Sequence, residues 1–239
     1  MSFCDESRRE ESRVKPMFAR VATRYDRINA AMCFGLDRVW RGRLAKSVLL
    51  SAEKNAPFID IACGSGDVAL ALLNRGAKKI VCADFCPEML ELAKGKATRA
   101  GFGANAEFVC ADCENLPFPD AGFGGATMAF GFRNFKNRAV CLAEIFRVMK
   151  PGARLGVLEV ARAPKLLRPI QNMFMRHFVP NLAKILGGSK EDYVYLAETT
   201  RDFPDQKALK KKFESSGFVN VKSRPMAFGM VALTLAEKP

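Results

Sequence analysis

Short runs of apolar residues alternate along the chain with longer stretches whose apolar residues recur at helical spacing. The first run, Phe58–Ala62, predicts a buried strand, and the residues after its glycine turn predict a helix. The same alternation continues to about residue 161, which is typical of an α/β fold built on an open sheet. The predicted strands are 58–62, 79–84, 107–111, 125–130, 154–161, 218–224 and 226–237, and the predicted helices between them are 67–75, 87–99 and 137–149.

The turn after the first strand predicts a nucleotide cradle. Gly64 and Gly66 leave room for a ligand against the backbone, and the free amides at the start of the next helix favour polar or negative groups. With Ala69 the turn satisfies a loose G-x-G-x-x-G/A pattern. That pattern alone leaves open whether the ligand is a dinucleotide or S-adenosylmethionine (SAM).

Acidic residues stand at or beside the ends of three predicted strands. Asp60 precedes the glycine turn, Asp84 closes the second strand and Asp112 follows the third. Asp84 is placed to bind a ribose in either kind of site. Asp60 favours SAM, because a nearby carboxylate suits an ammonium and a sulfonium better than a pyrophosphate. The alternative is that the acids are ordinary turn and cap residues.

Helical segments precede the first strand and follow the fifth. We expect residues 1–50, broken at Gly35, to form a cap over the ligand edge, with Tyr25 and Asp26 as its polar candidates and Trp40 as its anchor. Residues 165–215 are expected to form a helical lid. With both additions, residues 1–239 are expected to form a single domain.

Composition narrows the class of protein. The chain of 239 residues is 49% hydrophobic and 26% charged, with no apolar run of bilayer-spanning length. Met1–Arg13 lacks an apolar stretch typical of a secretory signal, so we expect a cytoplasmic protein. A net charge of +13 attracts nucleic acid or anionic lipid headgroups, or else marks a solvated basic surface.

The eight cysteines are expected to be reduced. Most fall within predicted strands or helices, where cysteine packs as a small hydrophobe; these are Cys33, Cys63, Cys82, Cys110 and Cys141. Cys110 and Cys113 form a C-x-x-C, but a zinc site there would collide with the proposed ligand edge. We therefore expect no metal.

With these motifs laid out, the chain resembles the class I SAM-dependent methyltransferases, and within them the ubiquinone/menaquinone biosynthesis C-methyltransferases, over nearly its whole length. The glycine loop and Lys150-Pro-Gly152 are shared by many methyltransferases. More specific to the quinone enzymes are Val21-Ala-Thr-Arg-Tyr-Asp26, Ala129-Phe-Gly-Phe-Arg-Asn134 and Tyr195-Leu-Ala-Glu-Thr-Thr-Arg201. The resemblance implies a Rossmann-like sheet of seven strands with helices on both faces and the last strand antiparallel.

The resemblance also implies SAM as the cofactor and a set of contacts for it. Added to Asp60, Gly64 and Gly66, the implied SAM residues are Ser65, Asp84, Phe85, Asp112, Cys113 and Ala129. Some positions depart from the family's usual residues: Ser65 replaces a threonine and keeps its hydroxyl, whereas Ala129 replaces a serine and has none.

The implied reaction is methylation of a ring carbon of a reduced polyprenyl quinol, either demethylmenaquinol or a methoxy-polyprenyl-benzoquinol. Arg133 is expected to stabilise the phenolate and Asn134 to orient the ring oxygen or a water. His177, the only histidine, is either the general base or a structural residue of the lid. Tyr25, Tyr195 and Arg201 are the candidates for binding the quinol. The apolar lid and the basic ends suggest contact with an anionic membrane, and a homodimer is left open.

Two rival interpretations stay open at this stage. The basic charge fits an RNA or protein methyltransferase, although the chain has no Asn-Pro-Pro-Tyr tetrad after the fourth strand and no separate RNA-binding module. A SAM-binding protein without activity, or a nucleic-acid-binding protein, is the other. We expect no nucleic-acid partner.

Overall fold

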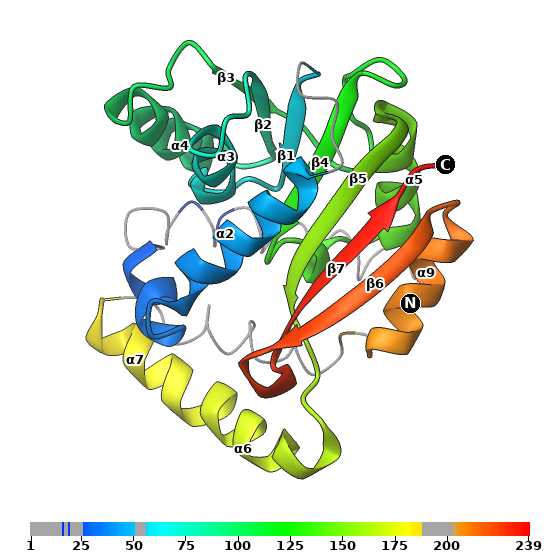
Figure 1. Ribbon diagram of the computed structural model, residues 1–239. Helices are drawn as coiled ribbons and strands as arrows, with labels where there is room; N and C mark the ends of the chain where they lie inside the picture. Colours follow the sequence, from blue (N-terminus) through cyan, green and yellow to red (C-terminus); the bar gives the residue numbers. More distant parts are fainter. Residues whose placement is uncertain (1–15, 17–18, 20–25, 51–55, 188–202, 204) are drawn as a thin grey trace, which may run out of the picture.

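A seven-stranded sheet forms the centre of the molecule (Figure 1). The computed structural model describes residues 16, 19, 26–50, 56–187, 203 and 205–239. The strand order is β3-β2-β1-β4-β5-β7-β6, in which β7 runs antiparallel to the other six strands. The strands are β1 (Phe58–Ile61), β2 (Ile80–Asp84), β3 (Ala106–Cys110), β4 (Phe123–Ala129), β5 (Met149–Val160), β6 (Val219–Met226) and β7 (Val231–Glu237). The expected topology is confirmed.

Helices cover both faces of the sheet. The longer ones are α2 (Leu36–Leu49), α3 (Asp67–Leu73), α4 (Pro87–Arg99), α5 (Arg138–Val148) and α9 (Gln206–Ser215). Strand β1 shows how the faces are divided: Phe58 packs with residues of α2 and α3, whereas Ile59 and Ile61 pack with residues of α5 and α9. The side chains of successive strand residues point to opposite faces, so the apolar residues of one buried strand contribute to two cores.

A run of short helical turns follows β5 and lies at the lower end of the view in Figure 1. It comprises η2 (Lys165–Leu167), α6 (Arg168–Met173), the π-helical turn η3 (Phe174–Phe178) and α7 (Val179–Ile185). We call residues 165–187 the lid segment. Its inner side is apolar, since Val179 and Ala183 are buried against Ile28 and Met89. Two short 3₁₀ turns, η1 (Phe132–Asn134) and η4 (Ala227–Gly229), follow β4 and β6.

The predicted cap and lid are only partly correct. Helix α2 lies on the sheet, because Leu44 and Val48 are fully buried in the core between the helix and the strands. Trp40 belongs to the same core, which confirms it as an anchor. At the other end of the predicted lid, α9 covers the sheet through Leu209 and Phe213. Helical periodicity shows that a segment is amphipathic but not which surface its apolar side covers.

Several element boundaries also differ from the prediction. Strand β5 begins at Met149, before the Pro151-Gly152 break, and β6 runs to Met226, with the turn η4 separating it from β7. The prediction that Cys141 and Cys113 are reduced is wrong in this structure, because they form a disulfide with their Cα atoms 5.3 Å apart. This bond ties the segment after β3 to α5, a pairing that no spacing in the sequence indicated.

Candidate active site

The glycine turn joins β1 to α3 in a left-handed conformation. Gly64 has φ of 52° and Gly66, the N-cap of α3, has φ of 81°, values that favour glycine. Gly66 also lies against α4, because a Cβ placed on it would be 2.9 Å from the Cβ of Ala93. The turn is therefore held between the helices α3 and α4.

Of the three acids predicted at the sheet edge, two are buried beside this turn. Asp84 accepts hydrogen bonds from the amides of Gly64 at 2.8 Å and Cys86 at 2.9 Å, and burial raises the pKa of its carboxyl. Asp60 lies within β1 and accepts a hydrogen bond from the Thr127 hydroxyl at 2.8 Å. Asp112 is exposed, and its carboxylate accepts a hydrogen bond from the amide of Glu114.

The Asp60 carboxylate is buried and only partly paired. Its Oδ2 atom is buried without a hydrogen-bond partner among the described residues. Burial raises the pKa of its carboxyl to about 7, against the opposing effects of the Thr127 hydrogen bond, the Ala69 amide and the charge of Arg41. A positive group placed beside Oδ2 would stabilise the charged form and supply the missing partner.

The remaining predicted cofactor residues differ in burial and in their contacts. Ser65 is buried and bonded to charged neighbours, and Phe85 is half-buried directly after Asp84. Ala129 is the last residue of β4. Cys113 is buried and bonded to Cys141, so it contributes a disulfide sulfur and not a thiol, and the C-x-x-C with Cys110 is not a pair of free ligands.

Arg133 and Asn134 form the turn η1 immediately after β4. The Arg133 side chain is buried, and its Nη1 group pairs with the Glu159 carboxylate and donates to the Phe130 carbonyl at 2.8 Å. Its Nε donor and the Oδ1 acceptor of Asn134 are both buried without a partner among the described residues. The turn adjoins the glycine loop, because a Cβ on Gly131 would be 2.7 Å from the Cβ of Ala62.

The predicted catalytic and substrate residues are therefore not all brought together. His177 lies exposed on the lid segment and lines an apolar groove there. Tyr25, Tyr195 and Arg201 lie outside the described residues, so their predicted roles stay predictions.

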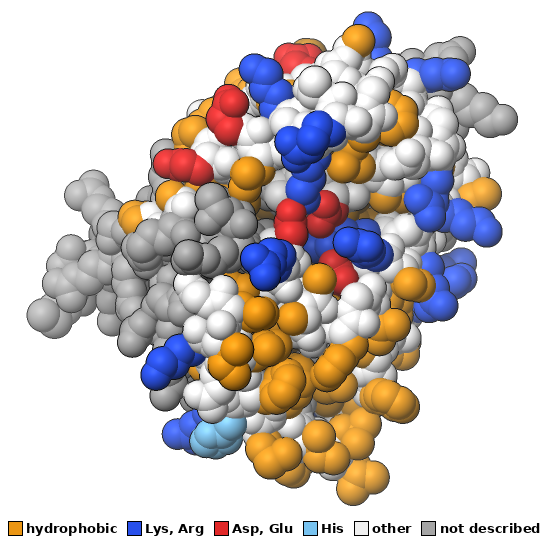
Figure 2. Space-filling view, turned by 90° about the vertical axis from the view of Figure 1, so that its left-hand side faces the viewer, with side chains coloured by type: hydrophobic (Ala, Val, Ile, Leu, Met, Phe, Trp, Pro, Cys, Tyr) orange, Lys and Arg blue, Asp and Glu red, His pale blue; other side chains and the backbone are white. Residues whose placement is uncertain are grey.

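The sequence analysis missed a charged network around the glycine turn. Lys96 of α4 forms ion pairs with Asp26 at 2.5 Å and Asp67 at 2.6 Å, and Arg41 of α2 pairs with Asp67 at 3.0 Å and with Asp37. In Figure 2 acidic side chains are gathered among Lys and Arg side chains near the centre of the face. The sequence analysis also assigned no role to Glu159. Its position as a lone acid near the end of the apolar strand β5 is the one feature that could have singled it out.

Solved structures of other proteins share the fold of this chain. Solved structures of a SAM-dependent methyltransferase from Thermotoga maritima (TM-score 0.66, 18% identity, 94% of this chain and 99% of that one) and of one from Aquifex aeolicus (0.57, 18%, 80% and 88%) share the fold. The glycine turn and the buried acids therefore lie on a fold that this chain shares with SAM-dependent methyltransferases.

Sequence similarity makes the assignment specific. The model of the ubiE/COQ5 methyltransferase family matches residues 6–238, and the chain belongs to that family. Relatives include the demethylmenaquinone methyltransferase of Thermus thermophilus, 38% identical across 93% of this chain and all of that one. The ubiquinone/menaquinone biosynthesis C-methyltransferase UbiE of Francisella philomiragia is 38% identical across 96% of this chain and 92% of that one.

The cofactor is accordingly SAM, and the site fits it. The unpartnered Oδ2 of Asp60 would suit a cationic part of SAM, and Asp84 at the end of β2 would hold the ribose hydroxyls. Gly64 and Gly66 have no side chains that would fill the space beside the turn. When bound, SAM supplies an electrophilic methyl group on a sulfonium.

We expect SAM binding near pH 7 to release a proton from Asp60. In the free enzyme the Asp60 carboxyl has a pKa of about 7, so it is protonated at lower pH. A nearby cation would lower that pKa. Titration calorimetry in buffers of different ionisation enthalpy should show proton release that Asp60→Asn abolishes. Equal proton release by the variant would contradict this assignment.

The same group predicts the pH dependence of stability. Its pKa is raised in the folded state from 3.8, so the native protein binds more protons than the unfolded chain between about pH 4 and pH 7. Asp60 therefore makes stability fall as pH rises through this window. Asp60→Asn should remove that contribution, which urea unfolding at several pH values would measure.

Proposed function

We propose that this enzyme transfers a methyl group from SAM to a ring carbon of a polyprenyl quinol, with demethylmenaquinol as its main acceptor. The names of its relatives support the substrate class: the proteins of Thermus thermophilus and Deinococcus radiodurans are demethylmenaquinone methyltransferases. The Francisella relatives are named for both ubiquinone and menaquinone biosynthesis, which keeps the benzoquinol precursor as the alternative acceptor.

The observation that carries this proposal is the pair of unpartnered polar atoms in η1. Buried polar groups in proteins nearly always have a partner, so Arg133 Nε and Asn134 Oδ1 call for one from a ligand. One is a donor and the other an acceptor. A ring oxygen that begins as a hydroxyl and becomes a phenolate can satisfy the acceptor first and then the donor.

The chemistry needs such a phenolate. A quinol carbon becomes nucleophilic when the adjacent hydroxyl loses its proton; that carbon then bonds to the methyl group as the bond to sulfur breaks. Loss of the ring proton restores the aromatic ring. Arg133 would stabilise the negative oxygen, since a guanidinium stays positively charged at neutral pH and does not act as a base. His177 stays a candidate for the base.

Restoring quinone synthesis in cells that lack their own quinol methyltransferase tests this function. We expect expression of this chain to restore methylated menaquinone in the lipid extract. Restoration of ubiquinone alone would keep the reaction and change the acceptor. If neither quinone is restored by folded, SAM-binding protein, the proposed acceptor class is wrong.

We further propose that the lid segment docks on an anionic membrane, where a polyprenyl quinol resides. An open groove of about 570 Å³ on this segment is lined almost entirely by apolar side chains, among them Phe34, Ile170, Met173 and Ile185. Figure 2 shows hydrophobic side chains gathered into one patch at the lower end of the molecule, where α6 and α7 lie in Figure 1. Large exposed apolar patches are typical of contact surfaces.

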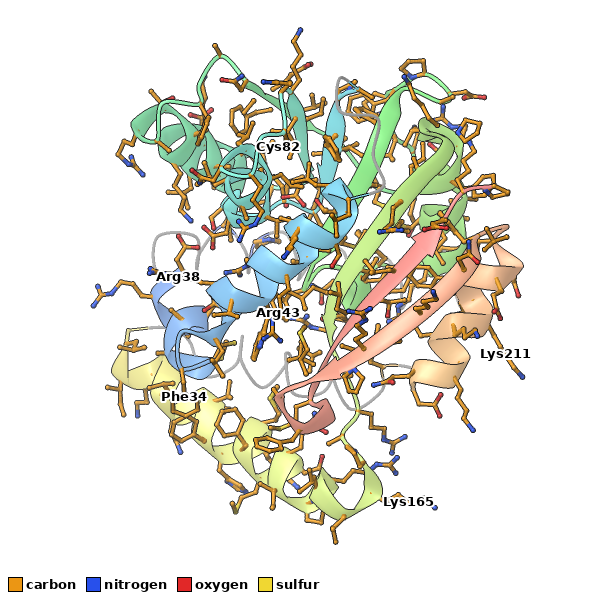
Figure 3. The ribbon with its side chains drawn as sticks, in the orientation of Figure 1. Phe34, Arg38, Arg43, Cys82, Lys165 and Lys211 are labelled. Atoms are coloured by element: carbon orange, nitrogen blue, oxygen red, sulfur yellow. A yellow bond between two sulfur atoms is a disulfide. The ribbon has the colours of Figure 1, made fainter. Side chains whose placement is uncertain are left out.

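The charge around this patch favours an anionic lipid surface as its partner. Residues 161–187 contain no acidic residue, and their basic residues are Arg162, Lys165, Arg168, Arg176 and Lys184. Figure 3 shows Lys165 at one end of the lid segment and Phe34 and Arg38 near the other. Phe34 is 73% exposed and still lies 6.3 Å from the Phe178 ring and 6.5 Å from the Phe174 ring. The turn before α2 and the lid segment thus form one surface. No helix in the described ranges is long and apolar enough to cross a bilayer.

A double variant, Met173→Asp with Ile185→Asp, should abolish this docking. Both side chains are more than 60% exposed, so the fold should tolerate the change, whereas insertion of two carboxylates into lipid is costly. We expect co-sedimentation with anionic vesicles to fall at least about tenfold. Leu50→Asp, at an exposed apolar residue outside the groove, is the control and should bind like the wild type. Unchanged sedimentation of the double variant would refute the docking surface.

A further inference from the structure

The carboxylate of Asp26 is bound by two side chains at the glycine turn. The Ser65 hydroxyl donates to Asp26 Oδ1 at 2.5 Å, and Lys96 Nζ lies 2.5 Å from Asp26 Oδ2. The Lys96 ammonium also donates to the Ser65 hydroxyl at 2.9 Å. A hydroxyl and an ammonium converging on one carboxylate, beside a backbone turn that binds SAM, form a recognition site for carboxylates.

Of the protein's own carboxylates around Lys96, that of Asp26 is the one that a ligand carboxylate can displace. Asp67 is the other acid on Lys96, and it is also held by Arg41, which pairs with Asp37 as well. Three acids thus face two bases, so a further carboxylate is accommodated only if one acid gives way. Asp26 is the one suited to leave, because its side chain is the most exposed of the three at 40% and contacts only Ser65 and Lys96 in this network.

We infer that Lys96 and Ser65 bind the α-carboxylate of SAM, which takes the place of the Asp26 carboxylate. SAM carries this group on its methionine end, together with an ammonium and a sulfonium. The unpartnered carboxylate of Asp60 supplies the complementary charge for the cationic part. Lys96 is then a cofactor-binding residue contributed by α4. The inference rests on SAM as cofactor and not on the identity of the methyl acceptor, so binding without any quinol tests it.

Comparing SAM with decarboxylated SAM separates this role from a structural one. A charge-assisted hydrogen bond to a carboxylate corresponds to about 10- to 100-fold in affinity. By calorimetry, Lys96→Met should weaken SAM binding by about that factor and change the affinity for decarboxylated SAM less than about twofold. Lys94→Met, at an exposed lysine two residues earlier on α4, is the matched control and should leave both affinities unchanged.

Two further variants keep the test decisive. Lys96→Arg retains the charge and should preserve most of the preference for SAM over the decarboxylated analogue, even if the methionine variant folds poorly. Asp26→Asn removes the competing carboxylate and should strengthen SAM binding several-fold, with little effect on the analogue. Equal losses for both ligands in Lys96→Met, or weaker binding of SAM alone in Asp26→Asn, would overturn the inference.

Discussion

Replacing Glu159 with alanine is expected to lower the free energy of unfolding by about 3–5 kcal/mol. Glu159 is buried at the end of β5 and carries the only carboxylate paired with the buried guanidinium of Arg133 among the described residues. Its second oxygen accepts the backbone amide of Arg133 at 3.1 Å. The alanine variant would therefore leave the buried guanidinium without its counter-ion, with only the Phe130 carbonyl as a partner of Nη1, and would remove the acceptor of the Arg133 and Val160 amides. Urea unfolding of the cofactor-free protein measures the loss.

The controls for this prediction replace the charge in different ways. Glu159→Gln keeps an acceptor for the Arg133 amide and should lose less than the alanine variant. Replacing both partners, as Glu159→Leu with Arg133→Met, removes the unpaired charge and should recover part of the stability. A loss below about 1 kcal/mol in Glu159→Ala would show that the pair is not needed for the fold and would contradict its structural role.

Arg133→Lys is expected to reduce turnover by about 10²- to 10³-fold while leaving SAM affinity within about twofold. Lysine keeps the positive charge for Glu159 but has no counterpart of the Nε donor, which is the atom proposed to meet the ring oxygen. The lysine variant therefore separates catalysis from folding, which Arg133→Ala cannot do because it would strand Glu159. Initial rates of methyl transfer and calorimetry with SAM give the two readouts.

Two comparisons keep this result interpretable. Lys136→Arg, at an exposed position three residues along, should leave turnover unchanged. The Arg133→Lys variant should unfold at nearly the same urea concentration as the wild type. Turnover close to that of the wild type in the folded lysine variant would remove Arg133 from the proposed chemistry. A parallel loss of SAM affinity and turnover would assign Arg133 to cofactor binding.

The parts of the site that are formed within one contiguous segment of the chain were predictable from the sequence. A buried apolar strand, a glycine turn and a helix start form a local unit, so Asp60, Gly64 and Gly66 were placed correctly. Parallel strands bring their carboxyl ends to one edge, so Asp84 could be assigned to the same edge. These inferences need no knowledge of which distant segments meet.

The parts that depend on contacts between distant segments were missed. Lys96 meets Asp26 across 70 residues of sequence, and nothing in the helical pattern of α4 singles it out from Lys94. The disulfide of Cys113 and Cys141 depends in the same way on how α5 packs. The prediction for Arg133 did not include its ion pair with Glu159, because that contact depends on the pairing of β4 with β5.

The most direct test of the proposed function is transfer of labelled methyl from SAM to purified demethylmenaquinol in anionic vesicles under reducing conditions, with the position of the label found by mass spectrometry of the product. We predict a label on the ring carbon that yields menaquinol. A label on a ring oxygen, or no labelled lipid from protein that binds SAM normally, would contradict the assignment of this enzyme as a quinol C-methyltransferase.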